Sequence, residues 1–247
     1  MTWTGTKRTW EKTSVHPLER EQGYFVKLDE APLRTPGKKL LAVPTSKLAG
    51  IIAREWDSQD TEVVSASLPV TRLCNSAIDR ADDVRKEVID RALRYGENDL
   101  LCYRSAEDID LRQRQSQVWD PILTWAERDL AAMFNVTSGV VSVEQPASSL
   151  ESIRNLLESY DAFKLAAMQE LVTLSGSVLL ALAVVRCFRS PESAWLASRV
   201  DEDWQAERWG LDPEAAEHAA RARNAFIEAA AMIFALDGSP RSSASRI

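Results

Sequence analysis

The octapeptide "ENDLLCYR" brings together side chains that could do chemistry. It places two acids, a thiol and a phenol within seven residues: Glu97, Asp99, Cys102 and Tyr103. A cysteine becomes a nucleophile when a nearby base lowers the pKa of its thiol or removes its proton. A thiol preceded by two leucines can also be buried, and a buried thiol behaves as a small apolar group. Catalysis and packing are therefore two hypotheses for the same stretch.

A catalytic Cys102 would need a histidine, and the chain has two, His16 and His218. Members of a catalytic triad need not be close in sequence, so either could be the base. One hypothesis is thus a small cytosolic cysteine hydrolase. The apolar context favours the other interpretation, in which Cys102 is packed and not catalytic.

Other chemistries find little support in the sequence. Two histidines and no paired cysteines do not make a metal site. The "PGKKL" stretch lacks the first glycine and the hydroxyl of a phosphate-binding loop, and no dinucleotide-binding glycine pattern occurs, so we expect no metal and no nucleotide cofactor. A net charge of -7 argues against nucleic acid or an anionic membrane as partner. Three widely spaced cysteines, at 74, 102 and 187, are typical of reduced thiols in a cytosolic protein.

The sequence predicts a cytoplasmic protein. Its first residues, "MTWTGTKRTW", have neither the apolar core nor the cleavage site of a signal peptide. The most apolar run, Val178–Val185, is too short to span a bilayer and ends at Arg186, so we expect no membrane insertion. It predicts a helix that is buried on all sides.

The first third of the chain predicts a small α+β domain over residues 1–82. Short β-prone pieces alternate with turn residues up to about residue 43. Thr45 can cap a following helix, whose apolar residues recur at helical spacing up to Trp56. We expect Trp56 to pack this helix on the sheet.

Residues 83–236 predict a larger, all-α domain, an orthogonal helical bundle, and the polar residues 237–247 predict a disordered tail. Pro121 interrupts one apolar stripe, so either Asp120 caps a new helix there or one long helix kinks. Further helices are expected over Ser149–Tyr160, Ala162–Leu174, Val178–Phe188, Glu192–Trp209 and Pro213–Leu236.

The predicted helix Glu192–Trp209 has an unusual distribution of tryptophan. Trp195, Glu202 and Trp209 are seven residues apart, which places them nearly in line on one face. Tryptophans around a polar group are typical of interface anchors. The alternative is that both faces are buried in a thick bundle and Glu202 is paired internally.

Five stretches, in this order, resemble the family of assembly chaperones that bind the alpha subunit of the catalytic sector of the F-type ATP synthase. The likeness covers about residues 8 to 236 and is carried by "LRTPGKKLLAVPTSKLAGIIAREWDSQ", "LPVTRLCNSAIDR", "ENDLLCYR" leading to "QSQVWDP", "TLSGSVLLAL" and "DEDWQAERWG". The resemblance implies an N-terminal α+β domain and a C-terminal helical domain. It also implies an ATP-independent holding chaperone with no enzyme activity and no nucleotide of its own. Mitochondrial members of this family carry a transit peptide, so the resemblance is to a bacterial, cytosolic member.

The resemblance also assigns expected roles to residues. Those expected to bind the alpha subunit are Trp195, Asp201, Glu202, Gln205 and Trp209. Those expected to form the family's structural signature are Trp56, Asp99, Cys102, Trp119 and Asp120. A helical scaffold with some other protein partner remains a further hypothesis.

Overall fold

The computed structural model describes residues 7–19 and 22–237. These divide into two compact units. The first comprises the chain up to Arg85 together with 162–167 and the part from Glu228 onward; the second comprises Lys86–Asp161 and Met168–Ile227. The predicted boundary after residue 82 stays a prediction, and all but the first residue of the predicted tail lies outside the described residues.

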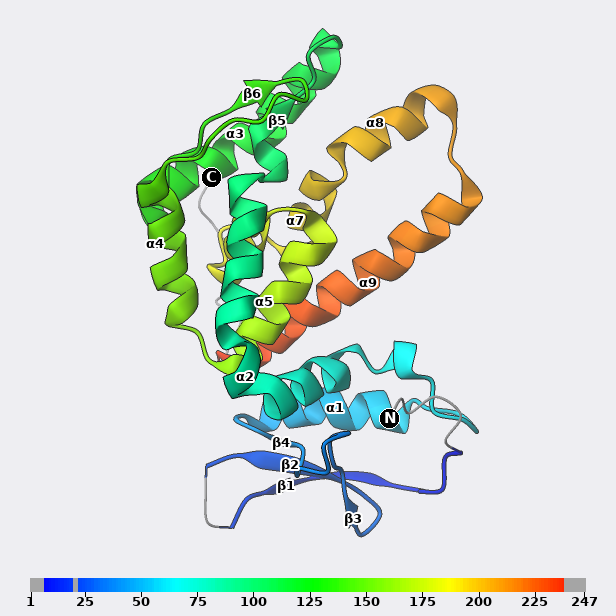
Figure 1. The fold of residues 1–247 in the computed structure, drawn as a ribbon. Helices are drawn as coiled ribbons and strands as arrows, with labels where there is room; N and C mark the ends of the chain where they lie inside the picture. Colours follow the sequence, from blue (N-terminus) through cyan, green and yellow to red (C-terminus); the bar gives the residue numbers. More distant parts are fainter. Residues whose placement is uncertain (1–6, 20–21, 238–247) are drawn as a thin grey trace. The chain divides into compact units, whose positions relative to one another are not determined.

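The first unit contains a small antiparallel sheet and a helix that packs on it (Figure 1). Its strands are β1 (Thr13–Pro17), β2 (Tyr24–Leu28), β3 (Ala31–Pro32) and β4 (Ala42–Val43), and β2 pairs with each of the other three. Helix α1 (Ser46–Asp57) begins where Thr45 accepts a hydrogen bond from the Leu48 amide, as predicted. Trp56 is buried, and its indole donates to Thr71 Oγ1 of helix α2 (Pro69–Glu97) over 3.2 Å.

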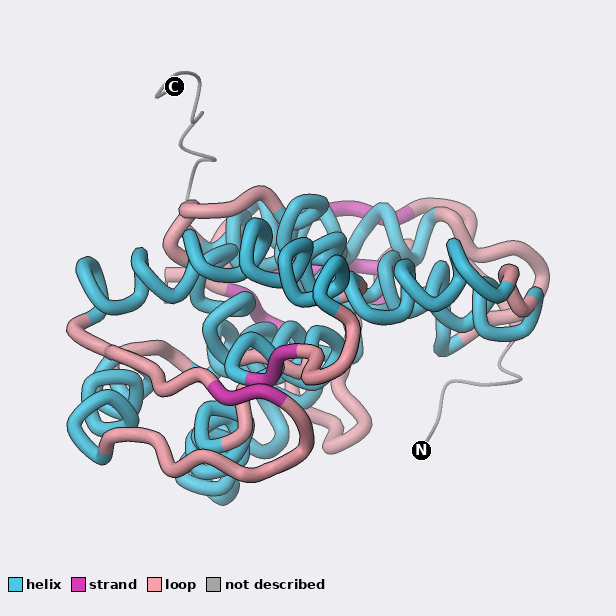
Figure 2. Tube along the Cα trace, turned by 90° about the horizontal axis from the view of Figure 1, so that it is seen from above, coloured by secondary structure: helices cyan, strands magenta, loops and turns pink. Residues whose placement is uncertain are grey.

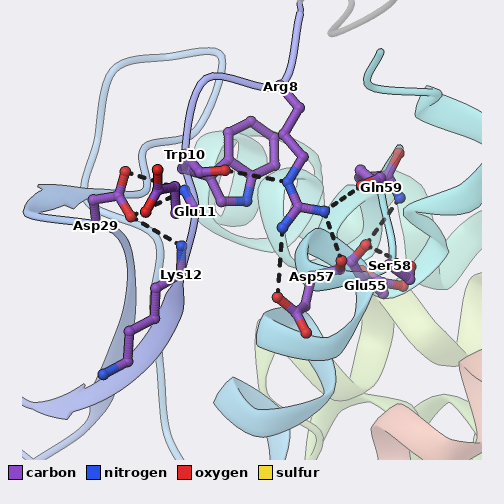
Figure 3. Close-up of polar contacts among 9 residues, drawn as sticks. All are labelled: Arg8, Trp10, Glu11, Lys12, Asp29, Glu55, Asp57, Ser58 and Gln59. Carbon is purple, nitrogen blue, oxygen red and sulfur yellow. Dashed lines mark hydrogen bonds and ion pairs between the residues drawn. The ribbon is translucent and has the colours of Figure 1, made fainter. Parts of the chain in front are cut away.

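A guanidinium fastens the N-terminal segment to the end of α1 (Figure 3). Arg8 Nη1 donates to the carbonyl oxygens of Asp57 and Gln59, and its Nε donates to that of Trp10. Asp29 accepts from the backbone amides of Glu11 and Lys12, which holds the start of β1 against the β2–β3 turn. These contacts place Trp10 beside Trp56, with ring centroids 5.3 Å apart.

The second unit is mostly helical, and its strands are very short beside its helices (Figure 2). Strand β5 (Tyr103–Arg104) pairs with β6 (Thr137–Ser138) in parallel. The helices are the end of α2, α3 (Ile109–Leu130), α4 (Ala147–Glu158), α5 (Ala162–Ser175), α6 (Val178–Val185), α7 (Pro191–Ser198), α8 (Val200–Trp209) and α9 (Pro213–Leu236), of which α5 and α9 also run into the first unit. A small sheet followed by a helical body confirms the predicted α+β class.

Helix α6 confirms the prediction made from its apolar run. All eight of its residues are buried, and Ser177 caps its first turn by accepting from the Leu180 amide. Pro121 lies inside α3, which is one continuous helix, so Asp120 does not begin a new one.

The prediction of one helix over Glu192–Trp209 is wrong. Helix α7 ends at Ser198 and α8 begins at Val200, because Arg199 has φ −109° and ψ 9° and its amide returns to the Leu196 carbonyl. The Ser198 hydroxyl donates to the Trp195 carbonyl, which satisfies a helix-end acceptor. Apolar spacing alone did not reveal this break.

Candidate functional site: the groove between α8 and α9

An open groove of about 500 Å³ lies between α8 and the first half of α9. The two helices are joined by the turn at 210–212, where α8 ends, and they diverge from it (Figure 1). Gly210 has φ +92°, a left-handed conformation that favours glycine, and its amide donates to the Ala206 carbonyl. The turn thereby ends α8 directly after Trp209, as predicted.

Large apolar side chains in this groove remain exposed to solvent. Leu196, Trp209 and Leu211 have exposed fractions of 62%, 77% and 69%. On the α9 side the groove is lined by four small residues: Ala215, Ala216, Ala219 and Ala220. Exposed apolar side chains that line one groove are typical of interaction surfaces and ligand-binding grooves.

Trp195 lines the base of the same groove, but it is buried. Its ring centroid lies 5.7 Å from that of Phe226 in α9. Trp195 therefore supports the groove, whereas Trp209 presents an open indole to solvent. The two tryptophans have different environments although the sequence places them symmetrically about Glu202.

Polar groups of α8 lie beside this apolar surface. Glu202 and Gln205 line the groove and are exposed. Glu202 Oε1 accepts from Arg199 Nη1 over 2.9 Å, and about half of the Glu202 side chain, 49%, stays exposed. An exposed pair of this kind contributes roughly 0–1 kcal/mol, so Glu202 is available to a partner at small cost.

The other face of α8 is fastened to α3 by polar contacts. Gln115 Nε2 donates to Asp201 Oδ1 over 2.7 Å, and Trp204 Nε1 donates to Asp108 Oδ2 over 3.2 Å. Asp201 therefore faces α3 and does not line the groove, unlike the other four residues expected to bind a partner. These contacts orient α8 so that Glu202, Gln205 and Trp209 face the groove.

Charge strengthens this attachment near the end of α8. Arg114 of α3 donates to Glu207 from Nη1 over 2.7 Å and from Nη2 over 3.0 Å, and these hydrogen bonds lower the pKa of that carboxyl. The pKa of Asp108 is also lowered, first by the Leu111 amide and then by the positive charge of Arg208. Arg208 also lies over the Trp204 ring, 4.3 Å from its centroid.

We expect reversal of Arg114 to loosen α8, and a compensating reversal of Glu207 to restore it. Arg114→Glu places two carboxylates together, so α8 amides should exchange with solvent faster. The double variant Arg114→Glu/Glu207→Arg recreates the pair in the opposite sense and should bring the exchange rates back. Hydrogen–deuterium exchange measures this directly. Unchanged α8 exchange in the single variant would show that the Arg114–Glu207 pair does not help to hold the helix.

The octapeptide 97–104 lies elsewhere in the second unit, and half of its residues are buried. Asp99, Leu101 and Cys102 are each fully buried. Asp99 Oδ1 accepts from Ser177 Oγ over 2.7 Å and from the Leu101 amide over 3.1 Å, while Oδ2 accepts from the Leu179 amide over 3.2 Å. The acid therefore fixes the first turn of α6.

Two titratable groups of the octapeptide are strongly affected by this burial. Desolvation raises the pKa of Asp99 to about 6, against the hydrogen bonds that favour its ionised form. Desolvation, assisted by the charge of Asp99, raises the pKa of the Cys102 thiol well above its ordinary range. A nucleophilic cysteine needs a lowered thiol pKa, so this environment favours packing over catalysis.

Arg104, Trp119 and Asp120 form a polar cluster beside α3. Arg104 is buried, lies 4.9 Å from the Trp119 ring centroid, and donates from Nη2 to Asp120 Oδ1 over 2.7 Å. Trp119 Nε1 donates to the Ala197 carbonyl over 2.7 Å, which connects α3 to the end of α7. Burial lowers the pKa of Arg104.

The sequence grouped part of this groove, and the binding role of those residues stays a prediction. It brought together Trp195, Glu202, Gln205 and Trp209, which line one groove despite the break at Arg199. It missed the exposed leucines Leu196 and Leu211 and the contribution of α9. The alanines of "PEAAEHAARA" at helical spacing were the available signal, because small side chains allow a second backbone to approach a helix closely.

We also searched the described residues for membrane-spanning helices and for groups of metal ligands. Within 7–19 and 22–237, no helix is both long and apolar enough to cross a membrane. Over the same ranges, no group of three His, Cys, Asp or Glu side chains is placed to hold a metal ion.

Comparison with known proteins shows the family to which the chain belongs. Residues 7–127 match the model of the family described as ATP12 chaperone protein. The mitochondrial protein atp12 of Schizosaccharomyces pombe is 26% identical over 216 residues, which cover 83% of this chain and 74% of that protein.

The structural comparison covers more of the chain. The crystal structure of Atp12 from Paracoccus denitrificans has a TM-score of 0.86 and 39% identity, covering 93% of this chain and 98% of that one. A variant of the P. denitrificans protein with an aspartate replaced by lysine also matches, with a TM-score of 0.86 and 38% identity over 93% of this chain and 97% of the other. The fold shared with these solved structures is thus that of a chaperone, and the chain belongs to the ATP12 family. Its role is in ATP synthase assembly.

Proposed function

We propose that this chaperone holds the unassembled alpha subunit of the F-type ATP synthase catalytic sector, and that it does so through the α8–α9 groove. The observation that carries the proposal is the exposed apolar side chains of Leu196, Trp209 and Leu211 beside Glu202. An unassembled subunit exposes apolar surface intended for its neighbours, and such surface drives aggregation. Covering it stabilises the soluble subunit by mass action.

The mixed character of the groove suits temporary binding. The indole and the leucines can cover apolar surface, while the Glu202 carboxylate orients a partner of opposite charge. A moderate, partly polar interface can be exchanged for the final neighbours of the subunit. We further propose that holding requires neither ATP nor turnover, because it depends on contacts alone.

The proposal is tested by following aggregation of the alpha subunit. Denatured alpha subunit is diluted into buffer that contains this protein without nucleotide, and light scattering is recorded. Suppression of scattering that saturates as the chaperone concentration rises supports the proposal. Scattering equal to that with an unrelated protein of the same charge would refute it.

A second prediction separates holding from hydrolysis by Cys102. We expect Cys102→Ser to lower the free energy of unfolding by roughly 1–2 kcal/mol, because a hydroxyl replaces a buried apolar group. Urea unfolding measures this loss, and the aggregation assay should be unchanged at a temperature where the variant is folded. Loss of holding by a variant that melts like the parent would assign Cys102 a direct role.

A further inference from the structure

The outward residues of the octapeptide form a second pocket, away from the α8–α9 groove. Asn98, Leu100 and Tyr103 line an open cavity of about 570 Å³ together with residues of the last turns of α2 and Gly176. Their sequence neighbours Asp99, Leu101 and Cys102 are buried. The stretch thus combines buried residues that anchor it with less buried residues that line the pocket.

The pocket has a firm framework. The Leu100 amide donates to the Gly176 carbonyl over 3.3 Å. The Asp99 carboxylate accepts a hydrogen bond from the Leu101 amide, which fixes the next turn of the chain. The Tyr103 hydroxyl donates to Asn98 Oδ1 over 3.2 Å. Because that bond uses the amide oxygen, the Asn98 NH₂ group remains a donor for a ligand.

The side chains that line the pocket combine aromatic surface with positive charge. Tyr95 and Tyr103 supply rings, Leu100 adds an aliphatic side chain, and Arg91 and Arg94 supply guanidinium groups. The seven described residues that line the pocket include no acid, although the chain has a net charge of -7. Arg91 pairs with Glu87 over 2.9 Å, whereas Arg94 makes no ion pair within the described part of the chain.

This chemistry selects a ligand class. Guanidinium and amide donors bind a carboxylate, and tyrosine rings with a leucine cover a bulky apolar side chain. Small-molecule sites bury most of their ligand, whereas this pocket is open to solvent and accommodates side chains from a longer chain. We propose that it docks an acidic peptide segment of a partner protein, in which a bulky apolar side chain stands beside a carboxylate.

The test uses a defined probe and isotope-labelled full-length protein. The probe is the acetylated, amidated peptide Gly-Glu-Phe-Glu-Gly, with Gly-Gln-Phe-Gln-Gly as its neutral match. Titration should shift the amide signals of Tyr95, Asn98 and Tyr103, and the acidic peptide should bind at least fivefold more tightly than the neutral one. Arg94→Glu should lower the affinity for the acidic peptide at least fivefold.

Two control variants make the outcome specific. Arg72→Glu makes the same charge change at an exposed position of α2 that does not line the pocket, and it should leave affinity unchanged. Glu202→Lys should also leave the affinity for the acidic peptide unchanged. The proposed docking site and the proposed alpha-subunit site are therefore tested independently. Equal binding of the two peptides, signal shifts outside the pocket, or equal weakening by Arg72→Glu would overturn the proposal.

Discussion

Replacing Asp99 by alanine is expected to lower the free energy of unfolding by roughly 3–5 kcal/mol, the largest stability loss among the substitutions considered. The reason is the set of donors left without an acceptor. The Ser177 hydroxyl and the amides of Leu101 and Leu179 all donate to this carboxylate in the interior. Urea unfolding of the alanine variant measures the loss.

The pH dependence provides an independent measurement at the same residue. Desolvation raises the pKa of Asp99 from 3.8 to about 6, so the folded protein retains this proton more strongly than the unfolded chain. The stability contributed by protonation is complete below about pH 4 and is lost as pH rises through 6. Relative to Asp99→Asn, the parent should lose roughly 2 kcal/mol between pH 4 and 7. A constant difference across this range would show that the hydrogen bonds keep the carboxylate ionised at its ordinary pKa.

Glu202→Lys is expected to abolish holding of the alpha subunit while leaving the fold intact. Reversing a charge that faces a complementary partner costs several kcal/mol of binding, whereas an exposed substitution changes stability by about 0.5 kcal/mol. The Glu202 side chain is half exposed, and the contact it loses is one surface pair with Arg199. The aggregation assay and thermal unfolding measure the two effects separately.

A matched variant controls for net charge. Glu127→Lys makes the same change at an exposed position of α3 that does not line the groove. It should hold the alpha subunit as the parent does. A Glu202→Lys variant that unfolds easily, or that holds as well as Glu127→Lys, would make Glu202 a structural acid or a residue without a role in binding.

The sequence predicted a helix well where one local feature, such as an apolar run or a capping hydroxyl, determined it. The apolar run at Val178–Val185 required a buried helix, and the Thr45 hydroxyl required a helix start, because each depends on neighbours in sequence. The break at Arg199 was missed because apolar spacing continues across it. Pro121 was ambiguous because proline is compatible both with a first turn and with a continuous helix.

The site was less accessible from the sequence, since tertiary contacts determine which face of α8 is free. Asp201 and Glu202 are adjacent acids, and only the structure shows that Gln115 binds Asp201 and leaves Glu202 at the groove. Asp120 pairs with Arg104, a contact across sixteen residues that no local pattern indicates.

We propose that the alpha subunit binds this chain at the α8–α9 groove without nucleotide. Sedimentation velocity of the two purified proteins, with and without ATP, tests it most directly. We expect one complex that forms equally in both conditions with the parent chain and does not form with Glu202→Lys. Separate sedimentation of the parent chain and the alpha subunit, or a complex that requires ATP, would contradict it.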